Sequence, residues 1–201
     1  MESPAMLFLG VDLGSTTVKY VLLDDSGAVL AKNYVRHQSA VRETLCRILS
    51  ELQSIPGKLS VALTGSGALA LAETLEVEFI QEVLAGTRFL RSHNPVADVA
   101  VELGGEDAKL LYLSDGVELR MNEACAGGTG AFIDQMASLL DTDAAGLDAM
   151  AQQSEKSYPI ASRCGVFAKT DVVSLLNAGI SKSDIARSVF EAYFEEWEES
   201  I

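Results

Sequence analysis

Asp12-Leu13-Gly14-Ser15-Thr16-Thr17-Val18-Lys19 and Glu102-Leu103-Gly104-Gly105-Glu106-Asp107-Ala108-Lys109 share one pattern: an acid, a leucine, a glycine, four residues and a lysine. Each stretch follows a short apolar run, at residues 6–11 and 96–101, and leads through a second apolar run to an Asp/Gly hairpin. A third apolar run follows each hairpin, at residues 28–35 and 117–121. The pattern predicts the order strand, tight turn, strand, hairpin, strand, and it does so twice. We therefore expect a duplicated domain, with the second copy starting near Pro95.

Helical periodicity fills the chain around these strands. Residues 41–52 place apolar side chains three and four positions apart, and residues 128–140 do the same. A short strand at 59–63 is expected to turn through Thr64-Gly65-Ser66-Gly67 into a helix that ends near Glu76. Ser181 resembles an N-cap that opens a final helix. Strands mixed with helices in this way predict an α/β fold.

Composition and charge narrow the class of protein. The 201 residues carry a formal net charge of −14, and 48% of them are hydrophobic. The apolar content excludes disordered and fibrous chains, and the acidity argues against a nucleic-acid-binding surface. No apolar run approaches the roughly 20 residues that cross a bilayer, and the N-terminus lacks the positive segment of a signal peptide. Three cysteines without a secretory signal favour reduced thiols or metal ligands, so we expect a cytoplasmic protein with no nucleic-acid or membrane partner.

The two acid-glycine turns suggest phosphate binding. Backbone N–H groups in a glycine turn can approach a phosphate closely, and the hydroxyls of residues 15–17 add donors. A carboxylate at the end of the strand, Asp12 or Glu102, can hold Mg²⁺ through its water shell. Two such turns facing each other would clamp a polyphosphate. The alternative is a pair of structural hairpins, in which Lys19 and Lys109 are solvated surface residues.

Two cysteines lie beside predicted helix starts. Cys125 stands in the glycine-rich stretch 122–130, and Cys164 precedes another helical stretch. A helix N-terminus favours the thiolate form, although two cysteines cannot complete a four-thiolate iron–sulfur site in one chain. A two-fold dimer would supply four ligands; the alternative is a pair of buried free cysteines. Cys46 has no glycine or basic neighbours and is expected to be a buried free cysteine. His37 and His93 show no ligand spacing, so both are expected on the surface.

The turns resemble the phosphate loops of the actin/hexokinase/Hsp70-like ATPase superfamily. This resemblance implies duplicated ribonuclease-H-like (actin-like ATPase) domains, at residues 1–95 and 96–201, that bind ATP or ADP with Mg²⁺. It implies catalytic roles for Asp12, Glu102 and Asp107, with Asp107 orienting the attacking water. Glu102 is longer than the Asp that often begins the second loop in this superfamily. The nucleotide contacts that the resemblance implies are Gly14, Ser15, Thr16, Thr17, Lys19, Gly104 and Gly105.

A narrower resemblance rests on the second loop together with Cys125-Ala126-Gly127-Gly128-Thr129-Gly130 and Ser162-Arg163-Cys164-Gly165-Val166-Phe167-Ala168. These stretches are similar to the activator component of 2-hydroxyacyl-CoA dehydratases, to which the ATPase subunits of benzoyl-CoA reductases are close relatives. The resemblance implies a homodimer with one [4Fe–4S] cluster bridged between subunits by Cys125 and Cys164. It also implies that ATP hydrolysis drives a low-potential electron into a dehydratase or reductase of anaerobic metabolism, with a ferredoxin or flavodoxin as electron donor. Residues 122–130 are closest to the long, two-copy activase-like members.

One departure from this family concerns the end of the chain. Family members continue with a second glycine-rich loop that holds adenosine, whereas this sequence ends at Ile201. We therefore expect a truncated second copy, and weak or no ATP binding by this polypeptide alone. A metal-free metabolite kinase of the same superfamily and a non-catalytic interaction module remain as alternative functions. The sequence does not specify the partner enzyme or its acyl-CoA substrate.

Overall fold

A computed structural model describes residues 5–114, 116–121, 129–162 and 164–198, and for residues 196–198 only the backbone. The chain divides into two compact units, Met1–Asp98 with Leu113–Val117 and Val99–Tyr112 with Glu118–Ile201. Each unit has its own buried core. Among the helices in the described ranges, none is both long and apolar enough to cross a lipid bilayer.

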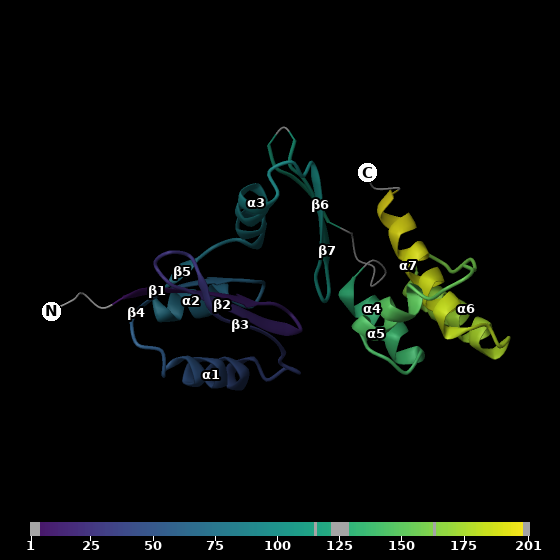
Figure 1. Cartoon of the computed structure of the whole chain (residues 1–201), viewed down its shortest axis with the longest axis horizontal. Helices are drawn as coiled ribbons and strands as arrows, with labels where there is room; N and C mark the ends of the chain where they lie inside the picture. The colour runs from purple at the N-terminus through teal and green to yellow at the C-terminus, as the bar shows by residue number, and fades with distance from the viewer. Residues whose placement is uncertain (1–4, 115, 122–128, 163, 199–201) are drawn as a thin grey trace. The chain divides into compact units, whose positions relative to one another are not determined.

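The first unit is built on a five-stranded sheet of order β3-β2-β1-β4-β5 (Figure 1). Strand β1 pairs antiparallel with β2 and parallel with β4, and β2 pairs antiparallel with β3. The first predicted strand-turn-strand-hairpin-strand pattern therefore forms the three neighbouring strands β1, β2 and β3 of the sheet. The strands are β1 (Met6–Leu13), β2 (Thr17–Leu23), β3 (Val29–Arg36), β4 (Lys58–Thr64) and β5 (Glu78–Phe79). The helices described in this unit are α1 (Val41–Leu52), α2 (Leu69–Leu75) and α3 (Glu82–His93).

Alternation along β1 decides which face of this sheet is buried. Every second residue of the strand is apolar and buried, because successive side chains of a strand point to opposite faces. Helices α1 and α2 pack against that face through Leu45, Ile48 and Ala72. The opposite face of β1 carries Gly10 and Asp12. The pattern that buries the apolar residues therefore also places the acid of the first turn on the other side of the sheet.

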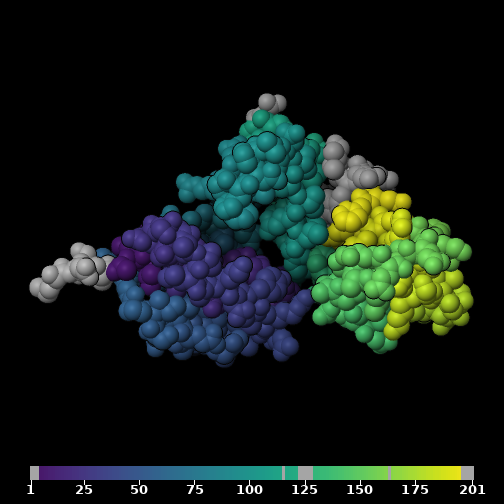
Figure 2. Space-filling view, in the orientation of Figure 1, coloured from purple at the N-terminus to yellow at the C-terminus, as the bar shows by residue number. Residues whose placement is uncertain are grey.

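The second unit joins a three-stranded antiparallel sheet, β6-β7-β8, to four helices. Its strands are β6 (Val99–Leu103), β7 (Ala108–Tyr112) and β8 (Glu118–Met121), and its helices are α4 (Gly130–Leu139), α5 (Ala144–Ala151), α6 (Gly165–Asn177) and α7 (Lys182–Glu198). The helices form one closely packed body (Figure 2). In its core, Phe132 of α4 stacks on Tyr193 of α7, with ring centroids 6.2 Å apart.

The structure confirms both predicted strand-turn-strand-hairpin-strand patterns and the helix over residues 41–52. The helix predicted over 128–140 is described from Gly130 to Leu139, and the final helix begins at Lys182, just after Ser181. Three elements were not anticipated: β5, α3 and α5. The mixed α/β class is confirmed as well.

Candidate functional site

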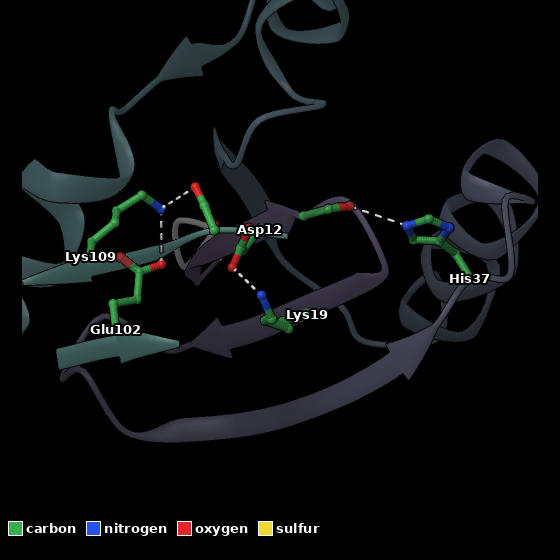
Figure 3. A network of polar contacts seen from close by, with 7 residues as sticks. Asp12, Lys19, His37, Glu102 and Lys109 are labelled. Atoms are coloured by element: carbon green, nitrogen blue, oxygen red, sulfur yellow. Dashed lines mark hydrogen bonds and ion pairs between the residues drawn. The ribbon is translucent and has the colours of Figure 1, made fainter. Parts of the chain in front are cut away.

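The first turn brings Asp12 and Lys19 together. The β1–β2 register places them directly opposite each other, and Lys19 Nζ lies 2.7 Å from Asp12 Oδ2 (Figure 3). The Lys19 ammonium also stands 5.7 Å from the centroid of the Tyr34 ring. Both partners of the ion pair are about one-third exposed, so the pair adds little stability. Its main effect is to hold one carboxylate oxygen of Asp12 and leave the other available.

The second oxygen of Asp12 has unusual surroundings. Asp12 Oδ1 is buried and has no hydrogen-bond partner in the described part of the chain, and the same holds for Thr64 Oγ1. These residues are paired across β1 and β4. A buried oxygen without a partner is costly, so the pair is suited to a ligand that supplies donors or a cation. The sequence pattern predicts only that Thr64 lies in a turn. Its position beside Asp12 depends on the register of strand pairing, which the pattern does not reveal.

Gly65 lets the backbone pass close beneath Asp12. Its φ is +104°, and a Cβ atom there would lie 2.6 Å from Asp12 Oδ1 and would also collide with the Leu13 carbonyl oxygen. Asp12, Lys19 and Thr64 border a pocket of about 330 Å³ in the first unit. The remaining lining is mostly apolar, formed by Gly10, Val11, Tyr20, Val21, Ala62, Leu63, Ile80 and Ala85.

The turn between β1 and β2 directs its carbonyl groups away from its exposed tip. Gly14 N–H donates to the Thr17 carbonyl at 2.9 Å, and His37 N–H donates to the Thr16 carbonyl at 3.1 Å. Within the described residues, the N–H groups of Ser15 and Thr16 have no hydrogen-bond partner. Ser15 is exposed. Free N–H groups at a glycine turn are the feature that binds phosphate oxygens.

The second turn gathers Glu102, Asp107 and Lys109. Lys109 Nζ lies 3.4 Å from Glu102 Oε1 and 3.3 Å from Asp107 Oδ2, and its side chain is only 7% exposed (Figure 3). A buried ammonium needs such carboxylate partners. Lys109 is thus buried, which excludes the alternative of a solvated surface lysine at this position. Gly104 is required sterically, because a Cβ there would collide with Asp107 Oδ1.

The second turn is also attached to the start of α4. Gly130 N–H donates to the Gly104 carbonyl at 2.8 Å, and Ala131 N–H donates to the Gly105 carbonyl at 3.1 Å. Thr129 caps the helix by accepting from Phe132 N–H. The helix that follows the glycine-rich cysteine stretch therefore begins on the backbone of the second turn.

Cys164 is the N-cap residue of the 13-residue helix α6, and Cys125 lies outside the described residues. The Cys164 thiol is free and partly exposed. A thiolate is the form of cysteine that ligates iron. The segment before it is held by Asp171, which accepts from Ala161 N–H at 3.0 Å. Among the described residues, no three His, Cys, Asp or Glu side chains gather to hold a metal.

Two expectations about single residues are wrong. Cys46 is exposed on α1 rather than buried, because the buried stripe of that helix runs through Thr44, Leu45 and Ile48. His37 is buried rather than on the surface, and its ring faces the first turn. His93 is exposed as expected and stacks on Phe89 of the same helix.

Comparison with known proteins gives consistent matches. Residues 9–195 match the model of the BadF/BadG/BcrA/BcrD ATPase family. The activator of lactoyl-CoA dehydratase of Anaerotignum propionicum is 31% identical over 192 residues, which are 92% of this chain and 73% of that protein. The (R)-2-hydroxyglutaryl-CoA dehydratase activating ATPase of Acidaminococcus fermentans is 29% identical over 90% of this chain and 72% of its own length.

Two solved structures are similar as well. Component A of the A. fermentans (R)-2-hydroxyglutaryl-CoA dehydratase has a TM-score of 0.81 at 27% identity, over 95% of this chain and 76% of that one. The activator of 2-hydroxyisocaproyl-CoA dehydratase from Clostridium difficile, solved with bound ADPNP, has a TM-score of 0.82 at 26% identity, over 96% of this chain and 74% of that one. The present chain shares the mixed α/β fold of these activators.

Proposed function

The chain belongs to the BadF/BadG/BcrA/BcrD ATPase family, and we propose that it couples ATP hydrolysis to electron delivery into a 2-hydroxyacyl-CoA dehydratase or a related CoA-ester reductase. The proposal rests on the carboxylate of Asp12, which combines a paired oxygen with a buried, unpartnered one beside a phosphate-binding type of turn. The named relatives are activators of such dehydratases, and another relative is one component of the benzoyl-CoA reductase of Thauera aromatica.

The first turn is proposed to bind phosphates and a metal ion. The free N–H groups of Ser15 and Thr16 and the hydroxyls of residues 15–17 would contact phosphate oxygens, with Gly14 shaping the turn. Lys19 would neutralise charge. Asp12 would hold Mg²⁺ through its water shell, because the unpartnered Oδ1 can accept hydrogen bonds from the metal-bound waters. When bound, Mg²⁺ neutralises the charge that develops on the phosphoryl group.

The second turn is proposed to position the attacking water. Glu102 would organise water with Asp12, and Asp107 would orient the nucleophile, while Gly104 and Gly105 would present backbone N–H groups to phosphate. The shared ammonium of Lys109 supports this assignment, because its ion pairs hold the carboxylates of Glu102 and Asp107 side by side. In phosphoryl transfer most of the catalysis is positioning and charge stabilisation of this kind.

The cysteines are proposed as ligands of one [4Fe–4S] cluster shared by a homodimer. Cys164 at the N-terminus of α6 fits a thiolate ligand, and Cys125 would supply the second from each subunit. When bound, the cluster carries the single electron that is passed to the partner enzyme. The hydrogen bonds from α4 to Gly104 and Gly105 support coupling, because a shift of the second turn would move the helix that follows Cys125.

The proposal extends to the whole molecule and its partners. Residues 1–95 and 96–201 would be two copies of an actin-like ATPase domain, as the matching acid–lysine pairs in their hairpins suggest. The protein would work in the cytoplasm as a homodimer, with a ferredoxin or flavodoxin as electron donor. Truncation of the second copy and weak or no ATP binding by this polypeptide alone stay predictions.

Anaerobic purification of the full-length protein tests this function. We expect an iron–sulfur absorption spectrum, one [4Fe–4S] cluster per two chains, and ATP hydrolysis. Cys164→Ala should lose the iron. Cys46→Ala changes an exposed cysteine that is distant in sequence from Cys164, and this variant should retain the iron. A colourless wild-type protein that phosphorylates a small molecule would indicate a kinase instead. A protein without any hydrolysis would indicate an interaction module.

A further inference from the structure

His37 contacts the first turn twice. Its N–H donates to the Thr16 carbonyl, and its ring Nε2 lies 3.1 Å from the Gly14 carbonyl oxygen (Figure 3). The β2–β3 register produces this placement, since Arg36, the last residue of β3, pairs with Thr17, and His37 follows it directly at the turn. The whole residue is only 6% exposed. Both the backbone and the ring of His37 therefore hold the same four-residue turn.

The hydrogen bonds of the ring define its tautomer. Ser39 N–H donates to His37 Nδ1 at 3.1 Å. A backbone N–H can only donate, so Nδ1 must be the unprotonated nitrogen that accepts. The proton of the neutral ring then lies on Nε2, from which it donates to the Gly14 carbonyl.

The segment after His37 adopts a conformation that aims the ring. Gln38 and Ser39 have φ values of +47° and +67°, a left-handed conformation that non-glycine residues rarely adopt. Ala40 N–H closes the bend by donating to the His37 carbonyl at 2.7 Å. Such strain persists where the surrounding contacts require it, and here those contacts converge on His37.

These contacts occupy carbonyl oxygens of the turn and leave N–H groups free. The carbonyls of Gly14, Thr16 and Thr17 all accept hydrogen bonds, two of them from His37. If the Gly14 peptide rotated, its carbonyl could face an incoming phosphate and repel it. We propose that His37 is a positioning residue that keeps the turn in the form that presents N–H donors to phosphate, an inference that rests on the proposed function of this turn.

Three substitutions separate the two ring contacts. His37→Gln places an amide nitrogen near the position of Nε2 and can donate to Gly14. His37→Asn places an amide oxygen near Nδ1 and can accept from Ser39 N–H, as in an Asx turn, but it is too short to reach Gly14. His37→Ala removes both contacts.

Steady-state ATP hydrolysis by the full-length protein is the first measurement. We expect His37→Ala to raise the KM for ATP about tenfold, the equivalent of one lost hydrogen bond, with a smaller change in kcat. His37→Gln should return KM to within about threefold of wild type, and His37→Asn should resemble His37→Ala. Melting temperatures recorded in parallel should not follow this order, because Asn restores the bend without restoring the Gly14 contact.

Nitrogen-15 NMR of the imidazole is the second measurement and needs no nucleotide. It should show the neutral tautomer protonated at Nε2. A ring protonated at Nδ1, a Gln variant as impaired as Ala, or an Asn variant with wild-type KM would each overturn the role of His37. If the wild-type protein neither binds nor hydrolyses ATP, the proposed function fails, and the role of His37 fails with it.

Discussion

Asp12 shows what a single residue contributes to the candidate site. We expect Asp12→Asn to lower the rate of ATP hydrolysis by at least about 10²-fold, because the neutral amide cannot replace the charge offered to metal and water. The ion pair with Lys19 is lost as well, yet the melting temperature should change little, since both groups are partly exposed. Hydrolysis assays with matched melting curves check this expectation.

Asp25→Asn is the control, because Asp25 is exposed in the hairpin after β2. Its hydrolysis rate should equal that of wild type. Equal activity of the Asp12 and Asp25 variants would remove Asp12 from the catalytic machinery.

Gly65 provides a residue-scale prediction for stability. Gly65→Ala should destabilise the protein by about 1–3 kcal/mol, because its positive φ is strained for alanine and the new methyl group would press on Asp12 and Leu13. Gly86→Ala is the matched change inside α3, where a Cβ meets nothing within 4 Å, and it should be neutral or stabilising by up to about 1 kcal/mol. Urea unfolding of both variants makes the comparison; equal effects would contradict the steric argument.

Sequence reasoning singled out the acids of both turns because their spacing repeats, and it left the role of the two lysines open. The structure pairs each lysine with an acid through strand register: Lys19 opposes Asp12, and Lys109 opposes Glu102. Thr64 and His37 could not be found in this way. Each lies next to the first turn only because a neighbouring strand pairs in a particular register, which the sequence does not display.

At the scale of the elements, periodicity predicted the helices that have a clear buried stripe. It found α1, where Leu45 and Ile48 face the core, and missed α3, in which Thr87 is the buried residue while Leu84 and Phe89 are exposed. Helix α5 buries only Leu147 among its described residues, and β5 has two residues. Short elements with so little apolar contrast give no periodic signal.

Helix α7 gives a prediction of pH dependence. The pKa of Asp184 lies below its usual value of 3.8, chiefly because the carboxylate accepts a hydrogen bond from Lys156 N–H and then from Glu155 N–H. A lowered folded-state pKa stabilises the fold above the unfolded pKa, and this contribution is lost as pH falls through the folded value. We expect the melting temperature to fall on acidification below about pH 4.

Asp184→Asn should show a weaker fall over the same pH range, because the amide cannot titrate. Asp141, whose pKa is lowered by its hydrogen bond and charge interaction with Lys182, keeps its own contribution in this variant. If the melting temperatures of wild type and variant fell equally on acidification, the assignment to Asp184 would be contradicted.

At the scale of the whole molecule, the two buried clusters each belong to one unit. Leu9→Ala and Met136→Ala each remove a fully buried side chain, and each should cost about 2–5 kcal/mol. Native-state hydrogen exchange should show the loss of protection mainly in the unit that carries the substitution. Leu84→Ala, at an exposed position, is the control and should change stability by less than about 0.5 kcal/mol.

The bend formed by Gln38 and Ser39 has a consequence for engineering. Each left-handed residue costs about 1–2 kcal/mol, which glycine would not incur. A directed-evolution campaign scored on heat tolerance would therefore enrich glycine at these positions. The selected variants would resist heat better, but the imidazole of His37 would be held less firmly. Selection for thermal stability and selection for ATP turnover would therefore favour different residues in this loop.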